Sequence, residues 1–354
     1  PPRSTLFPYT TLFRSDKLSL IKLNFYSGIF FMRPNTKGIS SAILSAIFLG
    51  LAPVFGKQAM LLGLPPLAVV AIRTVLATLL LFLVMVTFYR PFLYIYPAGL
   101  LGCLIAGWIN GIGSLFFYSA IGRLDASLGQ LIYSLYPLFI VIWLSLDNQP
   151  PNRLTLFRLF LTVPALFLLI QVEGANIDLV GVLQMLIAAA LYALHIPINQ
   201  RVLRDMPAPT VTLYTLLAMS AIVVPTYLFS GSATIQQTNS LGFTASIGLF
   251  GWPILGITLV TFLSRITLFL GVKHLGGMQT AFLGLGETLI TVVFAHLWLG
   301  ERFTNQQWIG ALLLLLSLSL ISLEKTKEKQ TIPGGFLNWL QPNKITSETW
   351  RPPD

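Results

Sequence analysis

Charged residues are scarce in this sequence. Only 10% of its 354 residues are Asp, Glu, Lys or Arg, whereas 55% are hydrophobic and the mean hydropathy is +0.78. A soluble domain carries roughly 25% charged residues, because its surface must face water. The polar surface is therefore too small to cover a globule in water, and the lipid bilayer is the solvent that this composition fits.

Cysteine is also nearly absent. The one cysteine, Cys103, lies inside an apolar run, which excludes a disulfide framework and a cysteine-based metal site. The sequence contains no Walker A motif, no Gly-x-Gly-x-x-Gly opening a helix, no His-Glu-x-x-His and no paired acidic metal motif. We therefore expect no cofactor, no metal and no ATP-driven step.

The net charge of +10 does not indicate a nucleic-acid partner. The basic residues are scattered between apolar runs, as membrane topology requires, instead of forming a stripe on one face. The partners that we expect are the lipid bilayer and a small-molecule substrate. A homodimer is left open by the sequence.

Long apolar runs dominate what remains. A membrane span needs roughly 20 apolar residues, and it must be helical because no water in the hydrocarbon satisfies its backbone. The sequence predicts ten such helices, at residues 39–61, 67–88, 96–120, 126–146, 154–172, 179–199, 209–229, 243–270, 278–299 and 306–323.

The loops between these spans differ in charge. One set of alternate loops has only Arg123 and Arg302. The other set and the two ends carry Arg33, Lys37, Arg90, Arg153, Arg158, Arg201, Arg204, Lys273, Lys325, Lys327 and Lys329. Cytoplasmic loops collect the basic residues, so we expect a multi-pass protein of the inner or plasma membrane with both termini in the cytoplasm.

The two ends of the chain lie outside the predicted spans. Residues 1–15 resemble translated adapter sequence, and Met32 looks like a natural start, so we exclude residues 1–31 as a non-native leader. Residues 324–354 are polar and then rich in proline and glycine. We expect them to form a disordered cytoplasmic tail.

The two halves of the chain resemble each other. Phe117–Leu124 aligns without a gap with Leu268–Leu275, at a spacing of 151 residues. Gly38–Ala59 aligns with Gly181–Val202 at a spacing near 144. Each half has five predicted spans, an odd number, so the second half enters the membrane from the opposite side. We predict two inverted five-helix repeats, at 38–172 and 179–323, although similar apolar helices can also look alike by chance.

Three stretches carry a resemblance to a known family. They are Ala71–Arg73, Ser134–Phe139, and Gly284–Leu289 continuing to Leu297–Arg302. In these stretches the chain resembles the drug/metabolite transporter superfamily, specifically its EamA-like transporters. The resemblance covers residues 38–323.

This resemblance implies a secondary transporter that exports or exchanges small metabolites, often amino acids, without hydrolysing ATP. The chain departs from the family's pattern at Thr288, where proline is usual. It also departs at Asp147–Pro150, where the first repeat lacks the Leu-Gly-Glu-Arg ending of the second. Members of one fold differ in substrate, so no single substrate follows from the resemblance.

Charged residues at membrane depth are the strongest site candidates, because each costs from about 2.5 to over 10 kcal/mol unless it is paired or hydrated. Glu287 lies about 15 Å into its span, and Arg73 is also well inside its own. We expect Arg73 to meet an anionic group of the substrate and Glu287 to meet a cationic group or a proton. The alternative is that the two pair with each other and only hold the helices together.

Four further residues are candidates for binding or coupling. Trp108 and Asn110 lie in a glycine-rich span and could face a cavity, and Tyr136 lies in the stretch that resembles the family. His195 could relay protons near neutral pH, or simply form a hydrogen bond between helices.

Pro53 and Pro197 occupy matching places in the two repeats. Each removes one helical hydrogen bond, and unwound backbone is tolerated in a membrane where it lines a cavity. We predict helix breaks at both prolines, with simple kinks as the alternative. For Lys57 and Arg265, nearer to the span ends, we expect side chains that extend to the membrane surface.

A secondary transporter is one of three classes that this sequence allows. An integral-membrane enzyme acting on lipid-linked substrates would gather polar residues at one face, whereas here they lie at depth. A channel would need a ring of like residues or a filter sequence, and neither is present. We therefore expect a carrier and not an enzyme.

Overall fold

The computed structural model describes residues 34–148, 151, 153–170, 178–203, 206–230, 243–300, 304–320 and 337, and the predicted leader 1–31 lies outside them. The described part is helical and contains no strand. Its α-helices are α2 (Pro34–Leu61), α3 (Pro66–Phe88), α4 (Pro97–Arg123), α5 (Ala126–Tyr133), α6 (Tyr136–Leu146), α7 (Arg153–Ile170), α8 (Leu179–Val202), α9 (Ala208–Ser230), α11 (Phe243–Leu275), α12 (Gly277–Gly284), α13 (Gly286–Phe294) and α14 (Asn305–Ser319). Short helical turns, η1 (Arg90–Leu93) and η2 (Ala295–Leu299), follow α3 and α13.

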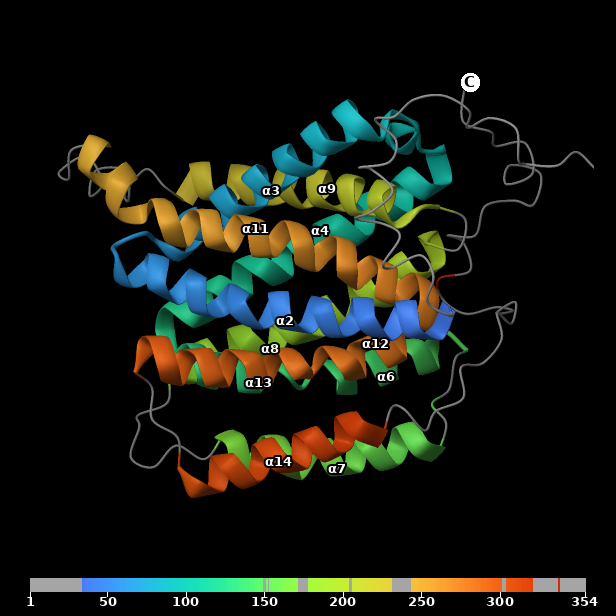
Figure 1. Cartoon of the computed structure of the whole chain (residues 1–354), viewed down its shortest axis with the longest axis vertical. Helices are drawn as coiled ribbons and strands as arrows, with labels where there is room; N and C mark the ends of the chain where they lie inside the picture. The colour runs from blue at the N-terminus through green and yellow to red at the C-terminus, as the bar shows by residue number, and fades with distance from the viewer. Residues whose placement is uncertain are drawn as a thin grey trace, which may run out of the picture.

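Eight helical segments of the described residues are long and apolar enough to cross a membrane. They are Lys37–Leu61, Pro66–Phe88, Pro97–Arg123, Ala126–Leu146, Leu179–Val202, Ala208–Ser230, Gly251–Leu275 and Gly277–Leu299. The chain is therefore a multi-pass integral membrane protein. The other two predicted spans fall on α7 and α14, which pack against each other at one side of the bundle (Figure 1).

The predicted helix breaks at Pro53 and Pro197 are wrong. Helices α2 and α8 continue through these prolines, because the rest of each helix keeps its own backbone bonds and a proline removes only one. The breaks lie instead in two other spans. Ser134 and Leu135 separate α5 from α6, and Leu285 separates α12 from α13.

Both breaks are tight turns of the backbone. The N–H of Leu135 donates to the carbonyl of Ile132 at 3.2 Å, and the N–H of Leu285 donates to that of Phe282 at 3.2 Å. Each bond spans three residues instead of the four of an α-helix. Pro137 accounts for the first break, since it lacks an N–H in the first turn of α6. The second break forms without a proline.

The two broken spans contact each other beside their breaks. Ser134 and Thr288, one beside each break, are joined by a hydrogen bond between their hydroxyl groups. The Tyr136 hydroxyl donates to the carbonyl of Ala281 at 2.8 Å. Gly284, three residues after Ala281, also faces this hydroxyl, and a methyl group on Gly284 would overlap it.

This contact predicts a compensating pair of substitutions. Gly284→Ala is expected to lower the melting temperature of the purified protein, because overpacking of a buried contact costs about 1–3 kcal/mol. Tyr136→Phe removes the overlapping hydroxyl, so the double variant should recover most of that loss. A thermal unfolding series of the two single variants and the double variant measures the coupling. Additive losses would contradict the contact.

Close helix contacts recur at opposite ends of the bundle. A Cβ on Gly38, near the start of α2, would lie 2.7 Å from Leu275 Cγ at the end of α11. A Cβ on Gly181, near the start of α8, would lie 2.9 Å from Leu124 Cγ at the end of α4. The two glycines align in the sequence repeat, and so do the two leucines.

Leu337 is the described residue of the predicted tail. Its side chain is buried against Ala106 of α4 and Ile198 of α8. Its N–H donates to Asp147 Oδ1 at 3.2 Å. This point of the tail therefore contacts the end of the bundle where α6 and α8 finish. The remainder of residues 324–354 lies outside the described residues.

Candidate functional site

A small cavity of about 50 Å³ lies among the helices, and we call it the central cavity. Side chains from both halves of the chain line it. They are Leu49, Ala52, Pro53, Arg73, Asn110, Gly113, Ser114, Phe117, Tyr118, Gln130, Tyr133, Tyr192, Arg265 and Glu287. Of the residues predicted from the sequence, the structure therefore brings Arg73, Asn110, Glu287 and Pro53 together.

Arg73 enters the cavity from α3 and is 5% exposed. Its Nη1 donates to Thr261 Oγ1 at 3.2 Å and its Nη2 to Ser114 Oγ at 3.4 Å. The guanidinium carbon lies 4.4 Å from the centre of the Tyr118 ring, within the range of a cation–π contact. Neutral partners thus hold Arg73 in place, and its buried Nε has no partner among the described residues.

Arg265 enters the cavity from α11 and is 6% exposed. Its Nη2 lies 3.5 Å from Asn110 Oδ1, and its buried Nη1 has no partner among the described residues. The expectation that this side chain extends to the membrane surface is therefore wrong, because the side chain points inward, to the amide of Asn110. A second guanidinium joins the first at the central cavity.

Glu287 lies in the first turn of α13, just after the helix break, and is 2% exposed. Gln130 of α5 forms a side-chain hydrogen bond with it. Its Oε1 is buried and has no partner among the described residues. Among those residues no ion pair joins Glu287 to Arg73 or Arg265. The alternative in which Arg73 and Glu287 pair only with each other is thus not the arrangement in the structure.

The prediction that Trp108 faces the site is wrong. Its side chain is 44% exposed and does not line the central cavity. Asn110 and Ser114, four residues apart on α4, face inward, whereas Trp108 and Ile112 lie on the opposite, exposed side of the same helix. The helix period places Trp108 on the outside.

Three other predicted residues do not line the cavity. His195 is fully buried, and its Nδ1 contacts the carbonyl of Tyr192 in its own helix. Tyr136 packs its ring against Tyr192 at 5.1 Å, and its hydroxyl is engaged by Ala281. Pro197 is buried in α8, away from the lining. His195 and Tyr136 thus both contact Tyr192, which lines the cavity.

Gln130, Tyr133, Tyr192 and Arg265 are lining residues that the sequence interpretation missed. Arg265 could have been predicted as a site residue, since a charge inside an apolar run indicates a functional position. The others are polar side chains in apolar helices, and nothing local distinguishes them from residues that bond within their own helix.

Lys57 is also placed differently from the prediction. Its Nζ donates to the carbonyls of Ile121 at 2.9 Å and Leu124 at 2.8 Å, instead of extending to the surface. These carbonyls end helix α4, where the helix dipole favours a cation. Lys57 therefore joins α2 to the end of α4.

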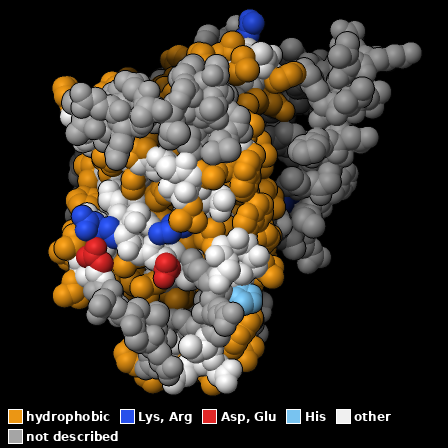
Figure 2. All heavy atoms as spheres, turned by 90° about the vertical axis from the view of Figure 1, so that its left-hand side faces the viewer, with side chains coloured by type: hydrophobic (Ala, Val, Ile, Leu, Met, Phe, Trp, Pro, Cys, Tyr) orange, Lys and Arg blue, Asp and Glu red, His pale blue; other side chains and the backbone are white. Residues whose placement is uncertain are grey.

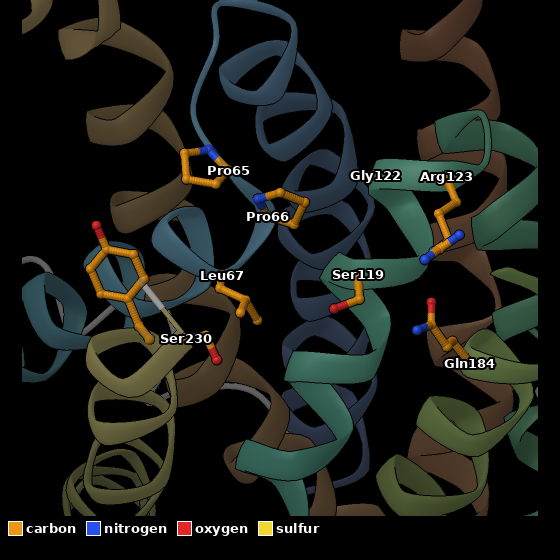
Figure 3. Close-up of a pocket in the computed structure, with 9 residues that line it drawn as sticks. Pro65, Pro66, Leu67, Ser119, Gly122, Arg123, Gln184 and Ser230 are labelled. Carbon is orange, nitrogen blue, oxygen red and sulfur yellow. The ribbon is translucent and has the colours of Figure 1, made fainter. Parts of the chain in front are cut away.

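A second, larger pocket of about 440 Å³ lies beside the end of α4, at the end of the bundle where Lys57 is bound (Figure 3). We call it the Arg123 pocket. It is lined by Pro65, Pro66, Leu67, Ser119, Gly122, Arg123, Gln184, Tyr227 and Ser230. Figure 2 views this end, where few charged side chains are visible among hydrophobic and uncharged ones.

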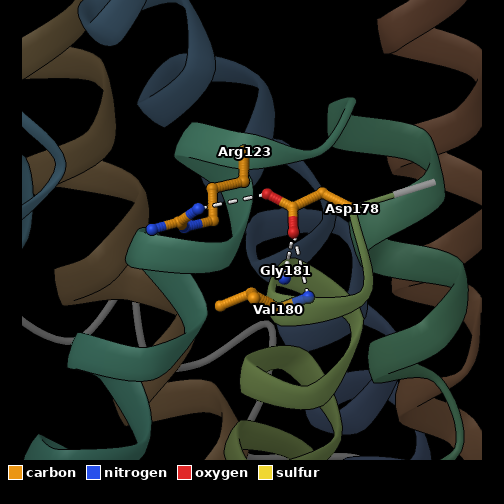
Figure 4. Close-up of polar contacts among 4 residues, drawn as sticks. All are labelled: Arg123, Asp178, Val180 and Gly181. Atoms are coloured by element: carbon orange, nitrogen blue, oxygen red, sulfur yellow. Dashed lines mark hydrogen bonds and ion pairs between the residues drawn. The ribbon is translucent and has the colours of Figure 1, made fainter. Parts of the chain in front are cut away.

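Arg123, which lines the Arg123 pocket, pairs with Asp178 across 3.1 Å (Figure 4). Asp178 also caps α8 by accepting from the N–H groups of Val180 and Gly181. The hydrogen bond from Arg123, together with these backbone bonds, holds the pKa of Asp178 below its usual value. The stabilisation from this carboxylate is thus present at neutral pH and is lost as the pH falls through that lowered pKa.

No group of three or more metal-ligating side chains occurs within the described parts of the chain. The central cavity instead presents two guanidinium groups and one carboxylate at membrane depth. Such a set can bind an anionic group and a cationic group or proton at the same time.

Comparison with known families now identifies the class of protein. The model of the EamA-like transporter family matches residues 36–171 and, a second time, residues 179–323. These two matches cover most of the chain, so the chain belongs to the EamA-like transporter family. The resemblance inferred from the sequence is thereby confirmed, and it is consistent with the drug/metabolite transporter superfamily.

Named relatives are also transporters. The chain is 20% identical to the uncharacterized transporter YcbK of Bacillus subtilis over 285 residues, which is 79% of this chain and 90% of YcbK. It is 24% identical to the uncharacterized inner membrane transporter YicL of Salmonella typhimurium, over 60% of this chain and 69% of YicL. A solved crystal structure, 13% identical, covers 81% of this chain and 97% of its own, with a TM-score of 0.63. That likeness establishes the fold.

Proposed function

We propose that this chain is a secondary transporter that exports or exchanges small polar metabolites, such as amino acids, by alternating access. The observation that carries the proposal is the central cavity. Arg73, Arg265 and Glu287 face it with buried atoms that no described residue satisfies. Buried polar groups are normally paired, so unpaired ones of both charges in one cavity are typical of a ligand site.

The three charged side chains have separate roles in this proposal. Arg73 and Arg265 bind an anionic group such as a carboxylate, for which guanidinium nitrogens are suitable donors. Glu287, which lines the same cavity, binds a cationic group of the substrate or a coupling proton. The cavity of about 50 Å³ is smaller than such a solute, so helices must move to admit it.

The proposed architecture is ten spans in two inverted five-helix repeats, with α7 and α14 as the fifth and tenth spans. Two features support it. The family model matches the chain twice, in tandem. The Gly38–Leu275 and Gly181–Leu124 contacts join aligned residues at opposite ends of the bundle, as an inverted repeat requires.

We also propose that both termini are cytoplasmic. Reporter fusions after Lys37, Arg204 and Lys327 are expected to read cytoplasmic, and a fusion within residues 230–242 is expected to read external. These positions follow from the excess of basic residues in alternate loops. An external reading after Lys327 would contradict both the span count and the inverted repeat.

Transport itself is tested in proteoliposomes loaded with radiolabelled metabolites, with and without a pH gradient. Arg265→Gln should fold, yet reduce transport of an anionic or zwitterionic substrate by about tenfold or more, since a charge-assisted hydrogen bond is worth about 1.5–3 kcal/mol. Arg90→Gln is the matched control, because Arg90 is exposed and its Nε bonds only within its own helix region. Wild-type transport by Arg265→Gln would contradict the assigned site.

A further inference from the structure

The Arg123 pocket lies where four membrane spans begin or end. Arg123 ends α4 and Ser230 ends α9, whereas Pro66 begins α3. Gln184 lies in the second turn of α8. All four helices are long and apolar enough to cross a membrane. Lipid headgroups occupy the layer just outside a hydrocarbon core of about 30 Å, so the pocket is at the level of the headgroups.

The residues of α4 that line this pocket continue its lipid-facing side. Trp108 and Ile112 are exposed near the middle of the helix. Ser119 and Arg123 follow Ile112 by seven and eleven residues, which places them on the same face of the helix. Exposed apolar side chains in the middle of a span contact the acyl chains of lipids. The pocket therefore continues a surface that the hydrocarbon tails already cover.

Arg123 has donors that its ion pair does not use. Its Nη1 donates to Asp178 Oδ2 at 3.1 Å, while its other terminal nitrogen points away from Asp178 (Figure 4). Ser119, one turn earlier on the same face, adds a hydroxyl group to the lining. A guanidinium and a hydroxyl group are suitable donors to the oxygens of a phosphodiester. This side of the pocket thus fits the phosphate of a phospholipid.

Gln184 has an acceptor without a donor. Its Oε1 is buried and has no hydrogen-bond partner among the described residues. The side chains of Gln184 and Arg123 point toward each other at one side of the pocket (Figure 3). Because buried polar atoms are normally satisfied, this oxygen indicates a ligand that donates a hydrogen bond. A primary ammonium group can donate one, whereas a quaternary ammonium group has no N–H to donate.

The charges around the pocket are balanced. The hydrogen bond from Arg123, together with the backbone bonds of Asp178, keeps the pKa of Asp178 low, so its carboxylate is ionised at neutral pH and offsets the guanidinium. The other described residues that line the pocket are uncharged. A ligand with one phosphate and one ammonium group matches this balance better than a net anion does.

We propose that the Arg123 pocket binds an amine-bearing zwitterionic phospholipid, represented by phosphatidylethanolamine. Arg123 and Ser119 bind its phosphate, its ammonium donates to Gln184 Oε1, and one acyl chain lies along α4 over Ile112 and Trp108. The pocket volume of about 440 Å³ is within the range of small-molecule sites. Polar pockets with a basic residue between spans are suited to lipid headgroups. The site needs a chain that spans the bilayer and does not depend on the proposed transport.

The test is native mass spectrometry of the full chain in detergent micelles, titrated with one phospholipid at a time. Phosphatidylethanolamine is expected to bind about tenfold more tightly than phosphatidylcholine, since only its ammonium can donate to Gln184. Gln184→Met keeps the length of the side chain and removes the acceptor, so the two lipids should then bind equally.

Two further variants test the phosphate and the charge balance. Arg123→Gln is expected to weaken both lipids by about tenfold, because both contain the phosphate. Arg90→Gln is the matched control, since Arg90 is an exposed arginine at the opposite end of α3, and it should change neither affinity. Asp178→Asn keeps an acceptor for the start of α8 but leaves the site positive. It should raise the affinity for anionic phosphatidylglycerol about twofold to fivefold.

If Arg123→Gln does not fold, Gln184→Met decides, because Gln184 Oε1 has no bond to lose. Equal affinities of the unmodified chain for phosphatidylethanolamine and phosphatidylcholine, or an unchanged ratio in Gln184→Met, would overturn the proposal. Unchanged binding of phosphatidylglycerol by Asp178→Asn would overturn the choice of a zwitterion. Soluble glycerophosphoethanolamine lacks the acyl chains and is expected to bind far more weakly than the lipid. Equally tight binding of this soluble headgroup would assign the pocket to a free solute and overturn the lipid site.

Discussion

Glu287→Gln is expected to fold and insert normally and to lose uphill transport by about tenfold or more. Glutamine keeps the shape of the side chain and can still bond to Gln130. It cannot carry a proton or neutralise a cation, and the loss of a charged partner is worth about 1.5–3 kcal/mol. The measurement is pH-driven uptake in proteoliposomes, compared with exchange of substrate across the same membrane.

The two transport modes separate the two roles of Glu287. If the carboxylate carries the coupling proton, exchange persists while uphill transport fails; if it binds the substrate, both fail. Because no ion pair joins Arg73 to Glu287 in the described structure, adding Arg73→Gln should not restore activity. Full pH-driven transport by Glu287→Gln would exclude the coupling role, and rescue by the double change would show that the pair is structural.

Gly50→Ala is expected to be strongly damaging to both folding and transport. A Cβ on Gly50 would lie 2.5 Å from the carbonyl oxygen of Glu287 and 2.7 Å from Ile290 Cβ. The Thr291 hydroxyl also donates to the Gly50 carbonyl at 2.6 Å, so α2 and α13 cannot separate without losing that bond. We expect a cost of about 1–3 kcal/mol, a melting temperature lower by on the order of 5 °C, and loss of transport.

Gly286→Ala is the matched control for this substitution. Gly286 also lies beside Glu287, but a Cβ there would be 3.6 Å from Ala46 Cβ, an ordinary van der Waals contact. This variant should therefore keep its melting temperature and most of its transport. Equal losses in the two variants would show that Glu287 tolerates no neighbouring change, and the argument from close approach at Gly50 would fail.

The candidate site was partly predictable because charge inside an apolar run is rare. Arg73 and Glu287 were found on this signal, and they do face one cavity. Arg265 is also a charge inside an apolar run, but it lies close to the end of its predicted span, and this position favoured a side chain that extends to the membrane surface. Only the contact with Asn110 on α4, far away in the sequence, shows that the side chain points inward.

Trp108, Pro53 and Pro197 show the limit of local patterns. Helices that are apolar on every side have no polar stripe, so the sequence could not show that Trp108 faces outward. Proline removes one helical hydrogen bond, and helices α2 and α8 continue through Pro53 and Pro197 without it. The breaks at Leu135 and Leu285 instead lie where the two spans contact each other through the hydroxyl groups of Ser134 and Thr288.

The sequence by itself determined that this protein crosses a membrane as helices, that its halves resemble each other, and to which family it belongs. These properties follow from composition, run length and short motifs, which are local and additive along the chain. Only the tertiary structure decided which polar side chains share the central cavity, where the helices break, and which carbonyls hold Lys57. Those outcomes depend on contacts between residues more than 60 positions apart, and such contacts leave no mark in a single apolar helix.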